Sequence, residues 1–289
     1  MKELIQRSIF GLLYVFLILL LVYYNFSPIL FSLFGSLAML ELGKILFLKR
    51  NAIQLWLLSF WIAFLPWFST VFVNTFFFEK PFFNFYTEWL TLFKIADRIV
   101  AFFEWRWLWI LGVFLATVVL FYRKGGYKSL LPFAYIIMPF VLAIEIDIAD
   151  QQLAISPILL IFIFMWTFDT FSYIFGKLFG RHVIAPSISP GKTWEGFAGG
   201  IAGAAVLTFF LSRSEILPFS HAISGYLLAL VLVLSAFLGD LFESKLKRKA
   251  GVKDSGAFIP GHGGILDRID SFLFAAPAFY FVYPLLLNL

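Results

Sequence analysis

The chain has 289 residues and a formal net charge of +5, and 62% of its residues are hydrophobic while only 13% are charged. Soluble domains are roughly half apolar and about a quarter charged, so this composition excludes a soluble globular protein and predicts a polytopic membrane protein. Cysteine is absent, which excludes disulfides, thiolate nucleophiles and cysteine-ligated zinc sites.

Long apolar runs predict an all-α fold with about nine transmembrane helices. A helix needs about 20 apolar residues to cross the hydrocarbon core of a bilayer. The first run follows a basic start but lacks a small-residue cleavage site, so we expect a retained helix rather than a signal peptide. The runs that qualify lie near 8–24, 28–48, 52–78, 105–122, 130–146, 156–175, 196–211, 222–239 and 271–287.

Residues 82–104 are too charged to span the membrane, but they have one apolar and one polar face. This pattern predicts an amphipathic helix that lies flat in the outer interface and orients the chain without doing chemistry. The sequence contains neither an internal repeat nor an inverted pair of broken helices, which disfavours a secondary transporter.

The distribution of Lys and Arg predicts the orientation of these helices. Of the 22 basic residues, 17 fall at the N-terminus or in loops on the same side of the membrane. Because cytoplasmic loops are rich in Lys and Arg, we expect a cytoplasmic N-terminus and an outside C-terminus. We expect two regions: five spans and the interfacial helix in residues 1–155, and four spans with two cytoplasmic polar loops and the candidate catalytic residues in 156–289.

Asp169 lies in the middle of the sixth apolar run. A carboxylate at this depth costs roughly 2.5–3.5 kcal/mol even on lenient insertion scales, so it needs a partner or a wet cavity. Ser172, Tyr173 and Gly176 share its helix face, which predicts a polar cleft that opens toward Lys177. A structural ion pair with a neighbouring helix is the alternative, but ionisable groups inside membranes usually mark function.

In the segment SPGKTWEG, residues 189–196, the tripeptide Gly191-Lys192-Thr193 resembles the end of a Walker A loop. Pro186 stands where that motif needs glycine and no strand is expected before it, so we exclude a P-loop fold. A Ser-Pro-Gly turn is instead predicted to present Lys192 and Thr193 at the start of a helix, where free N–H groups favour an anion. Glu195 fits a helix cap, and close helix packing explains the glycines that follow.

Asp240, Glu243, Ser244 and Lys247 have the spacing i, i+3, i+4 and i+7, so they share a face if the eighth helix continues into the cytoplasm. The residues that follow, 245–253, are strongly basic. This basic cluster alone could serve only to orient the chain and attract anionic lipid.

Asp267 and Asp270 are three residues apart at the start of the ninth helix. A helix N-terminus alone accommodates such a pair, but it does not explain Asp240 at the membrane end of another helix. Converging carboxylates without Cys or a His pair suit a hard cation, which predicts Mg²⁺ and leaves room for a second cation. The glycines of the run PGHGG, residues 260–264, let backbone N–H groups approach a phosphate, and His262 adds a donor.

The segment 239–271 resembles the C-terminal signature of phosphatidate cytidylyltransferases, also called CDP-diacylglycerol synthases. The segments around Asp169 and 189–196 also resemble this family, and the resemblance spans about 158–271. Lys177 stands where the family usually has Arg, which loses the two-pronged phosphate geometry. The residues that match the signature are Ser244, Lys247, Arg248, Lys253, Asp254, Pro260, Gly261, His262, Gly263, Gly264, Asp267, Arg268 and Asp270.

The resemblance implies that CTP and phosphatidic acid give CDP-diacylglycerol and pyrophosphate, with Mg²⁺, in a homodimer. It further implies a bacterial inner-membrane enzyme whose site faces the cytoplasm, with membrane lipid but no nucleic acid as a partner. We expect Asp240 and Asp267 to bind Mg²⁺, and Asp270 or Glu243 to orient or bind a second cation. Asp169 is expected to polarise the inner cleft or to bind cation and water. The residues expected to hold the substrates are Lys192, Thr193, Ser244, Lys247, Arg248, Lys253, His262, Gly263, Gly264 and Arg268.

Three other functions remain open at this stage. A CTP-dependent polyprenol or phytol kinase would use a related site, but a lipid alcohol would attack the γ-phosphorus. A transporter or channel would use the intramembrane Asp169 and would leave the polar C-terminal loop unexplained. A lipid-binding scaffold would survive the loss of every carboxylate named above.

Overall fold

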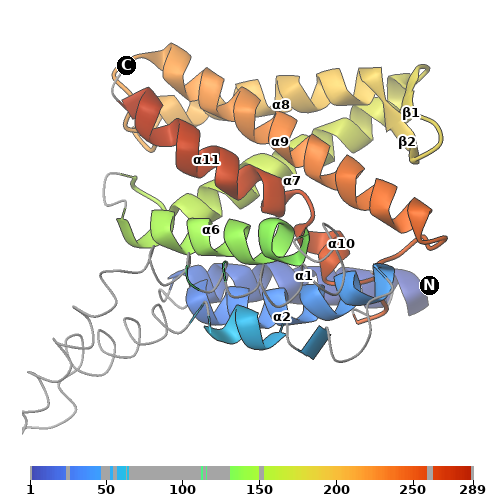
Figure 1. Ribbon diagram of the computed structural model, residues 1–289. Coiled ribbons are helices and arrows are strands. Elements are labelled where there is room, and N and C mark those ends of the chain that lie inside the picture. Colours follow the sequence, from blue (N-terminus) through green and yellow to red (C-terminus); the bar gives the residue numbers. More distant parts are fainter. Residues whose placement is uncertain are drawn as a thin grey trace, which may run out of the picture.

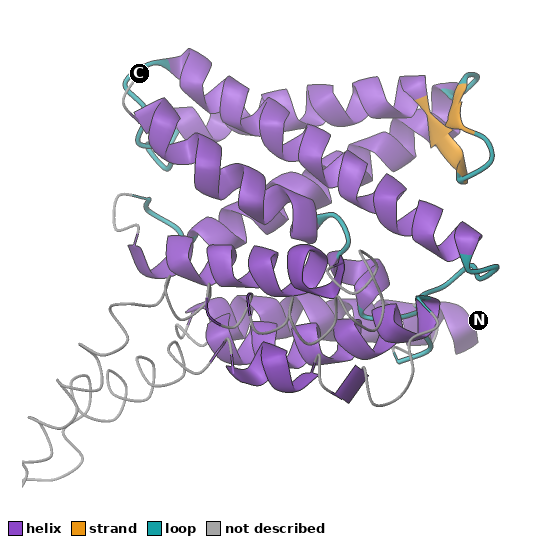
Figure 2. Ribbon diagram, viewed as in Figure 1, coloured by secondary structure: helices purple, strands orange, loops and turns teal. Residues whose placement is uncertain are grey.

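The computed structural model describes residues 2–23, 27–46, 131–149, 153–258 and 263–287, with a few further positions between 53 and 115. The first elements are α1 (Lys2–Tyr23), α2 (Ser27–Ile45), η3 (Phe133–Ile137), α6 (Met138–Ala149) and α7 (Pro157–Phe179). They are followed by β1 (Val183–Ala185), β2 (Ser189–Thr193), α8 (Trp194–Arg213), α9 (Ala222–Lys249), α10 (Leu266–Ile269) and α11 (Phe272–Leu287). Figures 1 and 2 show that helices make up nearly all of this part of the chain.

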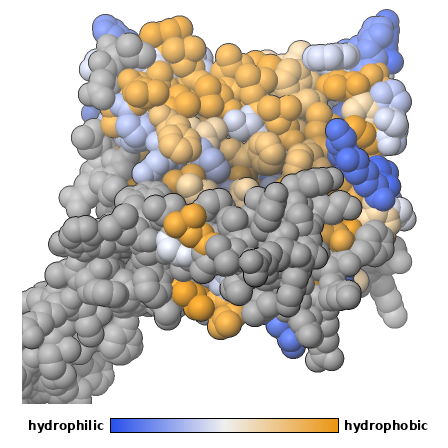
Figure 3. Space-filling view, in the orientation of Figure 1, coloured by the Kyte–Doolittle hydropathy of each residue, from blue (hydrophilic) through white to orange (hydrophobic). Residues whose placement is uncertain are grey.

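The described part is a polytopic helical membrane protein, as the composition predicts. Apolar side chains cover much of its visible surface over α8, α9 and α11, and hydrophilic residues gather at the edges (Figure 3). Most of the predicted spans 52–78 and 105–122 lies outside the described residues, and so does the whole of the interfacial helix 82–104. Five stretches in the described part are long and apolar enough to cross a membrane: Ser27–Ile45, Pro157–Phe179, Trp194–Arg213, Ala222–Lys249 and Leu266–Leu287.

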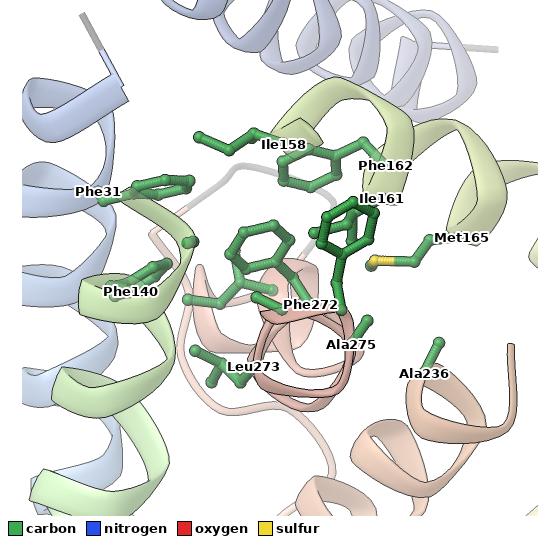
Figure 4. Packing of buried hydrophobic residues seen from close by; sticks show 14 of the residues in the cluster. Phe31, Phe140, Ile158, Ile161, Phe162, Met165, Ala236, Phe272, Leu273 and Ala275 are labelled. Atoms are coloured by element: carbon green, nitrogen blue, oxygen red, sulfur yellow. The ribbon is translucent and has the colours of Figure 1, made fainter. Parts of the chain in front are cut away.

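A core of stacked phenylalanines joins the N-terminal helices to the C-terminal ones (Figure 4). Phe31 of α2 stacks on Phe140 of α6 with ring centroids 4.9 Å apart, and Phe162 of α7 stacks on Phe272 of α11 at 4.8 Å. All four side chains are completely buried. Phe272 follows Asp270 by two residues, so this packing fixes the start of α11 next to a predicted site residue.

Helices α7 and α8 pack closely through glycines, as the small-residue pattern predicts. A Cβ added at Gly200 would collide with Ser172 and Phe168 of α7, and Gly199 and Gly203 are equally close to α7 side chains. The close approach lets α7 and α8 run side by side toward the strands at their shared end (Figure 2). Only residues without a side chain fit at these positions.

A β-hairpin between α7 and α8 corrects two predictions. Strands β1 and β2 pair antiparallel, with Val183 opposite Thr193, so the fold is not purely helical and a strand does precede α8. The Ser-Pro-Gly segment, 189–191, belongs to β2 instead of a turn. The turn lies earlier, where Ile188 N–H donates to the carbonyl of Ala185 at 3.1 Å with Pro186 in the position that proline favours. This antiparallel hairpin is the only sheet in the described residues, and a P-loop fold, which needs a parallel sheet, stays excluded.

Candidate active site

The carboxylates of α9 lie on one face of a helix that continues past its apolar run to Lys249. Ser244 Oγ donates to Asp240 Oδ1 at 3.2 Å, and Lys247 Nζ lies 2.5 Å from Glu243 Oε2. The predicted spacing of these four residues is therefore confirmed. Because the helix does not end at Gly239, it carries Glu243 and Lys247 beyond the predicted span on the same face as Asp240.

The hairpin presents Lys192 to α9. Lys192 Nζ lies 2.5 Å from Asp240 Oδ2 and 4.6 Å from the centroid of the Phe237 ring, one turn earlier on α9. Thr193 caps α8, since its Oγ1 accepts a hydrogen bond from Gly196 N–H at 3.2 Å. The structure thus places Lys192 beside Asp240, one of the predicted carboxylates, whereas the Thr193 hydroxyl caps the N-terminus of α8.

Glu195 closes the base of the hairpin. Its Oε2 accepts hydrogen bonds from the backbone N–H groups of Arg181 at 3.0 Å and His182 at 3.2 Å, and its Oε1 lies 2.6 Å from His182 Nδ1. The first-turn position of Glu195 predicted a helix cap, but the N–H groups that it binds precede β1. His182, which has no predicted role, thus contacts Glu195 through both its backbone N–H and its ring.

Asp267 is held at the start of the short helix α10. Its carboxylate accepts from Lys247 Nζ at 2.5 Å, from Ser255 N–H at 3.0 Å and from Gly264 N–H at 2.8 Å. Gly263 has φ +85° and no room for a Cβ beside Asp267, so only glycine suits this position. The N–H of Gly264, predicted to contact substrate phosphate, is engaged with Asp267 here.

Asp270 and Asp169 complete the carboxylate group around Asp240. A Cβ added at Gly239 would collide with the carbonyl of Asp270, so the missing side chain lets α9 pass directly beside the start of α11. Asp270 is buried, and Asp240 lies within electrostatic range of both Asp270 and Asp169. Four separate elements, α7, α9, α10 and the segment before α11, therefore supply carboxylates to one region.

The α7 residues predicted to line a cleft with Asp169 have different surroundings in the structure. Ser172 and Gly176 face α8, where they lie against Gly200 and Gly196, respectively. Tyr173 is 68% exposed, with Lys177 Nζ 5.8 Å from its ring centroid. The four residues therefore do not line one cleft with Asp169, because the close α7–α8 packing takes up part of the expected face.

The remaining basic residues lie around the end of α9. Arg248 Nε donates to the carbonyl of Ile188 in the hairpin turn at 3.1 Å, and its Nη1 donates to Val252 at 3.1 Å. Arg248 thus ties the hairpin to α9, and Lys253 is exposed beyond it. The side chain of His262 lies outside the described residues. The substrate roles of these residues stay predictions.

Two residues of the N-terminal helices reach the site, and sequence reasoning missed both. The Glu41 carboxylate of α2 accepts hydrogen bonds from Ser255 Oγ and from the N–H groups of Ile265 and Leu266. Tyr14 Oη of α1 donates to the carbonyl of Arg268 at 3.1 Å. The only sequence signal was that Glu41 is a single acid within an apolar run. Like Asp169, it is an ionisable group inside a predicted span, and such groups usually mark function.

The donor chemistry fits a hard divalent cation. Five carboxylates lie in this region, and three of them form ion pairs: Asp240 with Lys192, and Glu243 and Asp267 with Lys247. In the part of the chain that the structure describes, no group of three or more His, Asp or Glu side chains is arranged so that it could hold a metal ion. Mg²⁺ does not need such a group, because it takes one or two carboxylates and completes its shell with water and substrate phosphate. The carboxylates are Asp169, Asp240, Glu243, Asp267 and Asp270.

These features define a helical membrane protein with a charged site suited to phosphate esters. The chain matches the cytidylyltransferase family over residues 5–286 and belongs to that family. It is 37% identical over 291 residues to a Bacillus subtilis protein named phosphatidate cytidylyltransferase, and the alignment covers 99% of both chains. A protein of the same name from Haemophilus influenzae is 40% identical over 161 residues, or 55% of each chain. One from Staphylococcus epidermidis is 50% identical over 122 residues, which cover 42% of this chain and 46% of the relative.

Proposed function

We propose that this protein transfers the cytidylyl group of CTP to phosphatidate, forming CDP-diacylglycerol and releasing pyrophosphate. Membership of the cytidylyltransferase family and the full-length similarity to the Bacillus subtilis enzyme support this reaction. The structural observation that carries it is the meeting of Lys192, Lys247 and the carboxylates of four elements in one region of a membrane protein. A soluble polyanionic nucleotide and a lipid phosphate need such a site at the membrane surface.

The reaction requires positioning and charge stabilisation more than a strong base. A phosphate monoester is already ionised at neutral pH, so its oxygen can attack the α-phosphorus of CTP without losing a proton to the protein. The obstacle is repulsion between two anions, and preorganised cations reduce it. Lys192 and Lys247 sit on the carboxylates in this structure, where each can bridge a carboxylate and an incoming phosphate. Arg248 and Lys253 lie at the end of α9, where they would hold phosphates farther from the metal.

Mg²⁺ belongs to the proposed mechanism as the ion held by Asp240 and Asp267, with Asp270 or Glu243 orienting it or binding a second cation. When bound, it would neutralise charge on the reacting phosphate and on the departing pyrophosphate. Asp267 is oriented for this role by its bonds to Ser255 and Gly264. Asp240 is fixed by Ser244 and Lys192, and Asp169 would keep the inner side of the site polar.

The arrangement in the membrane is part of the proposal. We expect nine spans, a cytoplasmic N-terminus and an outside C-terminus, since 17 of the 22 Lys and Arg residues then lie on the inner side. This places the end of α9 and the loop to α10 in the cytoplasm, where CTP is. The bacterial relatives favour the inner membrane, and we expect a homodimer.

Isotope transfer tests the reaction directly. Purified protein is incubated with Mg²⁺, phosphatidic acid and CTP labelled with ³²P at either the α or the γ position. We expect α label in the lipid and γ label in pyrophosphate. If γ label enters the lipid and α label stays in CDP, the protein is a lipid kinase; if no label reaches the lipid but sealed vesicles show flux, it is a transporter.

A further inference from the structure

The N-terminal helices hold the loop that carries Asp267. We infer that Glu41 of α2 is a positioning residue for this loop, and that α2 is therefore part of the catalytic apparatus. Glu41 is 5% exposed, and its Oε2 accepts from Leu266 N–H at 2.8 Å and from Ser255 Oγ at 3.0 Å, while its Oε1 accepts from Ile265 N–H at 3.1 Å. A buried carboxylate is stable only where donors surround it, and here one loop supplies all three of these donors.

The loop is shaped to the Glu41 carboxylate. Cβ atoms added at Gly256 or Gly264 would collide with the Glu41 side chain, so the chain wraps closely around it at both ends of the segment 255–266. Figure 1 shows α10, which follows this segment, next to α2. An acid that served only to cap a helix would not need backbone contact on both sides.

Ser255 connects Glu41 to Asp267. Its hydroxyl donates to Glu41 while its N–H donates to Asp267 Oδ2 at 3.0 Å, so one residue carries a bond to each carboxylate. Leu266, which donates to Glu41, directly precedes Asp267. Tyr14 of α1 holds the carbonyl on the other side of Asp267, that of Arg268. Any displacement of the loop at Glu41 is therefore passed to the carboxylate that we assign to the metal.

Glu41→Gln tests this inference, which rests on the proposed role of Asp267. Glutamine has the same shape, but its amide N–H₂ group must face one of the three donors, so one anchoring bond is lost. We expect kcat to fall about 10–100-fold, as for partners that orient metal ligands, with a smaller change in KM for CTP and a higher Mg²⁺ requirement. Hydrogen exchange at the amides of Ile265 and Leu266, measured without substrate or metal, should become faster in this loop alone.

Ser32→Ala is the matched control, since Ser32 is a buried polar residue of α2 whose hydroxyl donates to Ile29 within the same helix. It should change neither exchange in the loop nor kcat. Tyr14→Phe should give the Glu41→Gln pattern more weakly. Unchanged exchange at residues 265 and 266, or faster exchange with unchanged kcat, overturns the inference. Exchange is measured without turnover, so a wild-type protein that fails the label-transfer assay refutes the proposed function and leaves this structural test intact.

A different observation supports a second inference, concerning Tyr135. Tyr135 lies in η3, a π-helical turn. Such turns are rare in proteins, and those that occur are often found at functional sites. The side chain is 4% exposed, and its ring contacts Phe242 of α9 at 5.0 Å and Phe274 of α11 at 6.2 Å. Its hydroxyl has no hydrogen-bond partner among the described residues, although it lies within electrostatic range of the carboxylates of α9 and α10.

We propose that the Tyr135 hydroxyl donates a hydrogen bond to an anionic oxygen of the bound substrates. A buried hydroxyl without a partner destabilises a protein, so its presence beside a charged site calls for an acceptor that arrives with the ligand. The two phenylalanines fix the ring between α9, which carries Asp240, and α11, which begins two residues after Asp270. The hydroxyl is thus preorganised for the substrate, and its missing partner lowers the stability of the substrate-free protein.

Tyr135→Phe separates this role from a structural one. We expect the unfolding temperature of the substrate-free protein to stay the same or rise, while kcat/KM falls about 10²-fold, the low end of the range for loss of one preorganised donor. Tyr226→Phe, near the start of the same α9, is the control and should change neither quantity. A lower unfolding temperature would show a structural partner for the hydroxyl, and an unchanged kcat/KM would show no contact with substrate; either result overturns the proposal.

Discussion

Asp267→Asn is expected to lower turnover by at least about 10³-fold while the protein stays folded, because it removes one negative charge from the proposed metal site without changing its shape. Removal of one preorganised neutral donor lowers turnover roughly 10²–10³-fold. The loss should be larger here, because the proposed metal ion stabilises the charge of the reacting phosphates and would bind less well without this carboxylate. The measurement is α-label transfer from CTP to lipid at saturating substrate and a range of Mg²⁺ concentrations.

The fold of the Asp267→Asn variant can be checked independently. The Asp267 carboxylate accepts hydrogen bonds from Ser255 and Gly264, and an asparagine carbonyl keeps part of that set. Exchange at Ile265 and Leu266, which Glu41 anchors, should therefore remain slow. Glu215→Gln, an exposed acid between α8 and α9, is the control and should retain full turnover. Near-normal turnover of a well-folded Asp267→Asn protein would refute the metal assignment.

Periodicity and spacing predicted the parts of the site that lie within one helix. Asp240 and Ser244, like Glu243 and Lys247, are four residues apart, and a continuous helix places each pair in contact whatever surrounds it. The apolar runs predicted the helices for the same reason, since span length depends on the membrane and not on the rest of the fold. Local rules therefore give the elements and the carboxylates that each one contributes.

Contacts between distant segments could not be predicted in this way. Glu41 binds Ile265 and Leu266 across more than 220 residues of sequence, and no local pattern records that α10 packs beside α2. The hairpin was missed because β1 is only three residues long and β2 contains a proline, so neither has the alternation that marks a strand. The Ser-Pro-Gly segment looked like the turn because serine, proline and glycine all favour turns. The residues of the true turn, Pro186 and Ser187, favour turns equally, so composition could not distinguish the two places.

Replacing Lys247 with Met is expected to have the largest effect on stability. Glu243 is completely buried, and Lys247 Nζ lies 2.5 Å from both its carboxylate and that of Asp267. Removing one partner of a buried ion pair costs about 3–5 kcal/mol, because the other charge stays buried without compensation. We therefore expect a Lys247→Met protein to unfold at a markedly lower temperature in mild detergent, and to lose activity with it.

A second substitution identifies the cause of this loss. If the buried charge of Glu243 is responsible, Glu243→Gln added to Lys247→Met should restore a large part of the lost stability, since no uncompensated charge then remains at that position. Lys245→Met, at an exposed position on the same helix, should change the free energy of unfolding by less than about 0.5 kcal/mol. The restored double variant should remain inactive, because Lys247 also approaches Asp267 in the site. Recovery of activity together with stability would mean that Lys247 only balances charge, and that other cations hold the substrate phosphates.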